Sequence, residues 1–223
     1  MSRHLSATAR LWNSPTRKFW FVGTAVLALA VPAMAQQSVM RVEEDWKLVL
    51  NEPNNGLYSP QFHTVMSPYP NINGYYAQVL WNYKEVWDFE PGGLQFQTWI
   101  GEDLTRSRDF RSESLSTTAE TITWTQRLSI NGGTIRFYVI YGQSTTWGAF
   151  GNYIIDADDG IDDLNSYDTN TSVHNSWITY GSNRVDSLVI TEVRRYDHDN
   201  NLLSTDSTPK VVFQLENSNS DSE

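Results

Sequence analysis

The chain of 223 residues contains no cysteine, and this absence limits both its stability and its chemistry. Without cysteine there is no disulfide, no thiol nucleophile, no thiolate ligand for a metal and no lipid anchor of the bacterial lipoprotein type. Many exported domains depend on disulfides. This chain must instead be held together by an ordinary core of apolar and aromatic side chains.

Histidine is also scarce, with four in the whole chain. Neither H-x-H nor H-E-x-x-H spacing occurs, so the sequence gives no support for a zinc site. The G-x-S-x-G motif of serine hydrolases is missing as well. We expect His63, His174 and His198 to lie in loops or turns, and no catalytic residue is assigned.

Basic residues are outnumbered, with 16 Lys and Arg against 26 Asp and Glu and a net charge of −10. Residues 1–35 hold four of the basic residues and no acid, so the remaining 188 residues have a net charge of −14. Such a surface repels phosphate backbones and anionic lipid headgroups. We therefore expect no nucleic-acid partner and no adsorption to a membrane.

The first 35 residues have the composition of a secretory signal peptide. Four basic side chains precede an uncharged run over residues 19–32, and Ala33-Met34-Ala35 is a small-x-small cleavage motif. The run of about 14 residues is shorter than the roughly 20 that a spanning helix needs. These features predict a secreted or periplasmic bacterial protein with no membrane span in the mature chain.

The remainder is expected to form one domain over residues 36–215. It shows no repeat of fixed period and no composition typical of a linker. Residues 216–223 are polar and acidic, and we predict that this tail is disordered.

Apolar side chains recur with a period of two residues along most of this domain. In residues 121–130, Ile122, Trp124 and Leu128 share one face, as in a half-buried strand. The following Asn-Gly-Gly predicts a tight turn into a second strand. Further strands are predicted over residues 46–50, 62–66, 75–83, 94–100, 134–141, 152–155, 184–196 and 211–215. No helical stripe is convincing, so the pattern predicts an all-β, two-sheet antiparallel β-sandwich or jelly roll.

Five carboxylates are crowded into the stretch DADDGIDD, at Asp156, Asp158, Asp159, Asp162 and Asp163. A calcium ion would relieve their mutual repulsion. With the glycine at 160 as the loop glycine of an EF-hand, however, three of the four ligand positions before and after it lack a suitable oxygen ligand. We favour a solvated acidic loop and keep Ca²⁺ as the alternative, with no other cofactor expected. A second acidic cluster, at 197–201, is predicted to be a turn.

The strand predicted over residues 94–100 places two amides and an indole on one face. Gln95, Gln97 and Trp99 alternate there with largely apolar neighbours. Such a surface can stack on a sugar ring and hydrogen-bond its hydroxyls. Arg136 and Tyr138 of the predicted hairpin are expected to extend it. The alternative is a second packed face of a central strand, with Trp99 in the core.

Several segments resemble a group of uncharacterised secreted proteins from planctomycete-type bacteria. They are PGGLQ at 91–95, STTWGAFG at 144–151, DLNSY at 163–167, SVHNS at 172–176 and NRVDSL at 183–188. The resemblance implies secretion and assigns no activity. The strand pattern is also similar to the concanavalin A-like lectin and glucanase sandwiches, which implies that fold.

The catalytic motifs of enzymes with that fold are not matched. The E-x-D-x-x-E motif of laminarinase-type hydrolases is absent. The sequence RSES at 111–114 departs in its last residue from the R-[ST]-E-L start of an alginate-lyase motif. The chain therefore leans away from being an enzyme.

Three functions remain open on the sequence alone. The leading hypothesis is non-catalytic binding of an extracellular polysaccharide or another envelope component through the aromatic and amide face. The second is a polysaccharide hydrolase or lyase whose acids come from separate strands, and the third is a structural envelope protein. Two carboxylates about 5–10 Å apart across a cleft would favour hydrolysis, whereas an exposed aromatic row would favour binding.

The cleavage motif makes a prediction about the exported protein. Because the small-x-small motif ends at Ala35, the mature chain should begin at Gln36. Mass spectrometry of material exported by a bacterial host should give the mass of residues 36–223. Recovery of exported protein that retains residues 1–35 would contradict this.

Overall fold

The computed structural model of the protein describes residues 37–52, 59–83, 92–115, 118–158 and 160–216. The predicted signal peptide, the cleavage site and nearly all of the predicted acidic tail lie outside these residues. Within them, no helix has the length and apolar character needed to cross a membrane.

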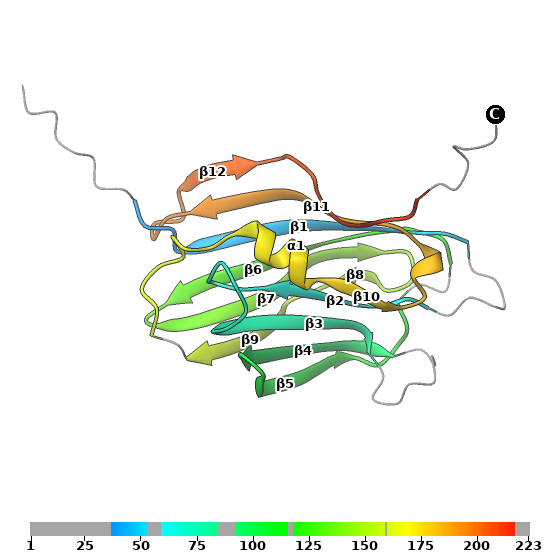
Figure 1. Ribbon diagram of the computed structural model, residues 1–223, viewed down its shortest axis with the longest axis horizontal. Helices are drawn as coiled ribbons and strands as arrows, with labels where there is room; N and C mark the ends of the chain where they lie inside the picture. The colour runs from blue at the N-terminus through cyan, green and yellow to red at the C-terminus, as the bar shows by residue number, and fades with distance from the viewer. Residues whose placement is uncertain (1–36, 53–58, 84–91, 116–117, 159, 217–223) are drawn as a thin grey trace, which may run out of the picture. The chain divides into compact units, whose positions relative to one another are not determined.

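Two antiparallel sheets pack as a sandwich, which confirms the predicted all-β two-sheet class (Figure 1). The smaller sheet has the order β10 (Trp177–Tyr180), β2 (Gln61–Met66), β3 (Tyr75–Tyr83), β4 (Gly93–Ile100) and β5 (Asp103–Arg111). The larger sheet has the order β12 (Leu202–Asp206), β11 (Val185–Tyr196), β1 (Arg41–Leu50), β6 (Thr121–Asn131), β7 (Thr134–Ser144) and β8 (Gly148–Phe150).

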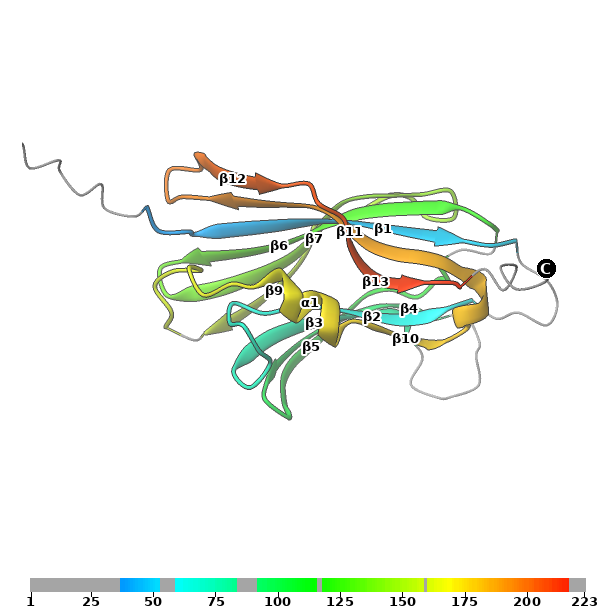
Figure 2. The ribbon, with the colours of Figure 1, turned by 45° about the horizontal axis from the view of Figure 1, so that its top comes forward.

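Two further strands complete the edges of the larger sheet. The strand β13 (Lys210–Gln214) pairs with one half of β11, while β12 pairs with the other half (Figure 2). At the opposite edge, β9 (Tyr153–Asp158) pairs with β7 beside β8. A short helix, α1 (Thr169–Asn175), and the 3-10 turn η1 (Ser182–Arg184) flank β10.

The predicted strands are found, and the elements that were missed share a weak apolar pattern. The strand β5 is exposed from Asp103 to Asp109 at the edge of the smaller sheet, so neither of its faces carries an apolar stripe there. The strand β12 is similarly exposed. Helix α1 has only seven residues, and its start is fixed locally because the side chain of Asp168 accepts a hydrogen bond from the backbone of Asn170.

A cluster of aromatic side chains joins the two sheets. Trp46 and Trp124 are opposite one another on β1 and β6, with their rings stacked at 5.9 Å. From the smaller sheet, Trp81 meets Trp124 at 4.4 Å between ring centroids, and Phe62 stacks on Trp81 at 5.4 Å. All four side chains are buried. Each large ring contributes several kcal/mol in such a core, on the order of 3–5 kcal/mol if truncated to alanine.

One carboxylic acid lies inside this core. Glu44 on β1 is 0 % exposed, and it accepts hydrogen bonds from the Tyr167 hydroxyl at 2.5 Å and from Nε1 of Trp46 at 3.1 Å. Burial raises the pKa of Glu44 to about 7, against the opposing effect of these hydrogen bonds. Tyr167 comes just before α1, so the bond attaches that segment to the interior of the sandwich.

Glu44 should make the stability of the fold fall as the pH rises. Native Glu44 keeps its proton up to about pH 7, whereas the unfolded side chain releases it near 4.5, so the unfolded state binds fewer protons in that window. Relative to Glu44→Gln, the wild type should lose on the order of 3 kcal/mol of unfolding free energy between these two pH values. Urea denaturation of both proteins at each pH measures the difference.

A paired comparison is required because His63 acts in the opposite direction. Burial lowers the pKa of His63 from 6.5 to about 4, so its contribution to stability increases with pH over that range. The Glu44→Gln variant retains His63. The contribution of His63 is therefore the same in both proteins and cancels when their unfolding free energies are subtracted. A difference that is constant with pH would contradict the assignment of Glu44.

Candidate functional site

The alternation along β4 decides where the predicted amide and indole side chains lie. Leu94 and Phe96 belong to the core between the sheets, so the side chains between them point to the outer face of the smaller sheet. Gln95, Gln97 and Trp99 therefore share that outer face, and Trp99 is not part of the core cluster. Trp99 is half-buried at that position.

Neighbouring strands extend this surface into three rows across the sheet. The register of β10, β2, β3, β4 and β5 sets side chains of the same face opposite one another. We call this surface the amide face. Its rows are Trp177, His63, Leu80, Gln95 and Asp109; then Val65, Gln78, Gln97 and Ser107; then Tyr76, Trp99 and Leu104.

A chain of hydrogen bonds fixes the polar side chains of the amide face. The Trp99 indole donates to Oε1 of Gln97 at 3.0 Å, and Nε2 of Gln97 donates to Oε1 of Gln95 at 2.5 Å. Nε2 of Gln95 in turn donates to Asp109 at 2.8 Å. Gln97 is only 8 % exposed, so its amide serves mainly to orient its neighbours. Asp109 at the end of the chain is exposed, and the Trp99 ring and the Gln95 amide are half-buried.

Two pairs of aromatic rings lie at different places on the amide face. His63 and Trp177 stack at 4.2 Å, and Trp177 is 45 % exposed. Gln78 contacts Nδ1 of His63, and the low pKa of that histidine leaves its ring neutral at physiological pH. Tyr76 and Trp99 form the second pair, with parallel rings at 6.3 Å. The face thus offers apolar rings held in place by amides.

Sequence reasoning missed most of this surface. Trp177 lies on the short strand β10, which has no pattern of its own. His63 was expected in a loop but lies on β2, inside a strand that the sequence does predict. The alternation of that strand was the available signal, because it places His63 opposite to the buried Phe62.

Arg136 and Tyr138 are not part of the amide face, contrary to expectation. Both lie on β7 in the larger sheet, where they alternate with the buried Phe137 and therefore point away from the sandwich on its opposite side. Arg136 is paired with Asp156 at 3.3 Å. The β6–β7 hairpin that contains them pairs with β1 and β9 in the larger sheet. The strand β4 belongs to the smaller sheet, so the hairpin is not its neighbour.

The outer face of the larger sheet is occupied by ion pairs. Arg194 contacts Asp45 at 2.6 Å and Glu192 at 2.5 Å, and Arg127 contacts Glu43 at 2.7 Å. Because these charges neutralise one another across adjacent strands, this face is better suited to stabilising the sheet than to binding a ligand.

The acidic stretch forms the end of β9 and the loop after it. Asp156 pairs with Arg136, Asp163 accepts a hydrogen bond from the backbone of Asn165, and the backbone of Gly160 bonds to the β6–β7 turn at Gly133. Among the described residues, no three acidic or histidine side chains are placed to hold a metal ion. The side chains of Asp158 and Asp159 lie outside that description, and among the described residues Asp162 makes no hydrogen bond or ion pair with Asp156 or Asp163. The calcium site stays a hypothesis.

The second acidic cluster forms the turn that the sequence predicts. Asp197 accepts hydrogen bonds from the backbone and the side chain of Asn201, and Asn200 has a positive φ of 66°. These contacts join β11 to β12. Asp and Asn are used here for tight-turn geometry.

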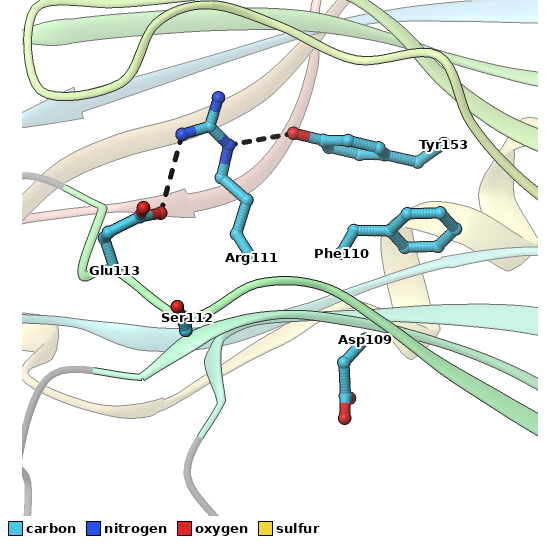
Figure 3. A pocket seen from close by; sticks show the side chains of 6 residues that line it. All are labelled: Asp109, Phe110, Arg111, Ser112, Glu113 and Tyr153. Carbon is cyan, nitrogen blue, oxygen red and sulfur yellow. Dashed lines mark hydrogen bonds and ion pairs between the residues drawn. The ribbon is translucent and has the colours of Figure 1, made fainter.

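A hollow of about 440 Å³ opens beside the last residues of β5 (Figure 3). Nε of Arg111 donates to the Tyr153 hydroxyl at 2.9 Å, and the same guanidinium is 3.6 Å from Glu113. Figure 3 shows Asp109 pointing away from this group, on the other side of the strand. The two carboxylates at the hollow therefore do not face one another as a hydrolytic pair would.

Two carboxylic acids near the core, Glu44 and Glu120, have shifted pKa values, and both make structural contacts. Glu44 is enclosed between the sheets. Glu120 accepts hydrogen bonds from Ser144, Thr145 and Thr146 in the β7–β8 loop; burial opposes the shift, but these bonds together lower its pKa. Neither side chain is arranged to reach a bound sugar.

Comparisons of the chain with protein-family models, with curated proteins and with solved structures give no match. The site must therefore be interpreted from its own geometry.

The position of Trp99 on the outer face makes a prediction about stability. Trp99→Ala should lower the free energy of unfolding by only about 1 kcal/mol, since it leaves no enclosed cavity. The matched variant Trp124→Ala removes a ring from between the sheets and should cost about 3–5 kcal/mol. Denaturant melts of the two variants give both values. Equal losses would show that Trp99 supports the fold as a core residue does.

Proposed function

We propose that the protein is exported by its predicted signal peptide and binds an extracellular polysaccharide, without catalysis, through the amide face. The observation that carries this proposal is the pair of aromatic platforms, Trp177 on His63 and Trp99 beside Tyr76, of which the first contacts the amide of Gln78 and the second donates to Gln97. The proposal is in keeping with the resemblance to secreted planctomycete proteins and to concanavalin A-like sandwiches.

The chemistry of the face suits a sugar. The C–H faces of sugar rings stack on indole and imidazole rings, which lose little conformational entropy because few of their bonds rotate. Amides both donate and accept, so they match sugar hydroxyls. Gln95 and Asp109 offer such groups at the end of the first row opposite to Trp177. The rings provide affinity, and the polar groups provide orientation.

Rigid support favours this face over a loop site. Its side chains project from five neighbouring strands of one sheet, and their hydrogen bonds run along β4 from Trp99 to Gln95 and then across to Asp109 on β5. A surface that is held in place before binding loses less entropy when the ligand arrives.

Binding is tested with the mature chain and insoluble polysaccharides. We expect residues 36–223 to be retained by at least one of cellulose, chitin, xylan, mannan and laminarin in a sedimentation assay. Trp177→Ala and Trp99→Ala should each reduce retention by about tenfold or more, because each removes a stacking surface.

The control is an aromatic side chain on the other sheet. Tyr141 on β7 is 70 % exposed, so Tyr141→Ala should leave retention unchanged while it removes a similar amount of aromatic surface. Far-ultraviolet circular dichroism should show that all variants are folded. Retention that is insensitive to both tryptophan substitutions, or no retention on any polymer, would refute the proposal.

A further inference from the structure

The two aromatic platforms are too far apart to contact a single sugar. Trp177 and Trp99 lie on β10 and β4, which are three strands apart, and in the first and third rows of the amide face. With strands about 4.8 Å apart and a rise of about 3.3 Å per residue, the offsets are about 14 Å across the strands and about 13 Å along them. The two indoles are therefore separated by about 20 Å.

The surface between the platforms is formed by tightly packed amide and apolar side chains, of which Gln78 is 7 % and Gln97 8 % exposed. Gln78 and Gln97 occupy the middle row, between His63 in the first row and Tyr76 in the third. A line from Trp177 to Trp99 crosses this row obliquely. A ligand that uses both platforms must therefore pass over the amides, and it must be several linked rings long.

The amide face also carries little charge. Of the residues in its three rows, Asp109 at one end is the only acidic one, and burial lowers the pKa of His63 to about 4. None of the three rows contains a lysine or an arginine. An anionic polymer would meet no opposite charge on this surface, and the acidic protein would repel it.

We propose that the ligand of the amide face is a linear, uncharged oligosaccharide segment of several sugar units that lies obliquely across the strands from Trp177 to Trp99. This inference rests on the proposed function and specifies its ligand. The two platforms act as linked subsites, because a sugar bound at one raises the effective concentration of the next part of the chain at the other.

Linked subsites make affinity depend on chain length. A disaccharide occupies one platform, whereas a chain that reaches both gains the second contact without a second loss of translational freedom. Affinity should therefore rise with length and then level off. Removal of either indole should abolish the increase, since the remaining platform is then the only stacking surface of the pair.

The experiment is isothermal titration of residues 36–223 with oligosaccharides of two to eight units. The neutral probes are cello-, xylo-, manno-, chito- and laminari-oligosaccharides, and the charged probes are oligomers of alginate and polygalacturonate of the same lengths. In one neutral series, Kd should fall by about tenfold or more between the dimer and the hexamer and then stay constant. The charged series should bind at least about tenfold more weakly.

Variants separate the two subsites. Trp177→Ala and Trp99→Ala should each bring the Kd of the hexamer close to that of the dimer, while Tyr141→Ala should preserve the length dependence. The inference is refuted if the dimer binds as tightly as the hexamer, if a charged series binds best, or if only one of the two tryptophans matters. If no series binds at all, both the proposed function and this inference are refuted. If a series binds without the expected dependence on length, charge or both tryptophans, only this inference is refuted.

Discussion

The contact between Trp124 of the larger sheet and Trp81 of the smaller one is the interaction on which the rest of the structure depends. Their ring centroids are 4.4 Å apart, and Trp46 and Phe62 extend the same cluster on either side. The chain has no cysteine, so no disulfide cross-links the two sheets. Close packing of large rings must do so, and it also sets which face of each strand is turned inward.

The amide face is a direct consequence of that choice. Once Leu94 and Phe96 are buried against the aromatic cluster, the period of the strand leaves the glutamines and Trp99 no position except the outer side. The site therefore derives its rigidity from the core, because a shift of β4 by one residue would bury amides and expose leucine. Stability and recognition are linked here through the register of a single strand.

The sequence predicts the strands that have one apolar face, and it predicts little that depends on how strands are assembled. Period two locates β3, β4, β6 and β7 well, but β5 and β12 are exposed edges with no apolar stripe. The membership of a sheet is not a local property. The β6–β7 hairpin was expected beside Gln95, but its pairing with β1 takes Tyr138 to the other side of the sandwich.

Contacts between distant segments account for the other surprises. Glu44 is buried and bonded to Tyr167, which is 123 positions away in the chain, so no local pattern announces an acid with a pKa near 7. The platform of Trp177 on His63 likewise joins β10 to β2. Of the candidate site, the sequence predicts Gln95, Gln97 and Trp99 on one face. The residues that surround these three come from other strands, and only the three-dimensional structure identifies them.

The exposure of β5 has a consequence for the self-association of the protein. An edge strand presents unpaired backbone groups, to which the edge of another molecule can add and extend the sheet into a fibre. Here β5 carries charged side chains, Arg106 and Arg108 among them, and charged side chains on an edge strand disfavour such pairing. The same polar sequence that gives β5 no apolar stripe therefore makes it a poor template for a further strand.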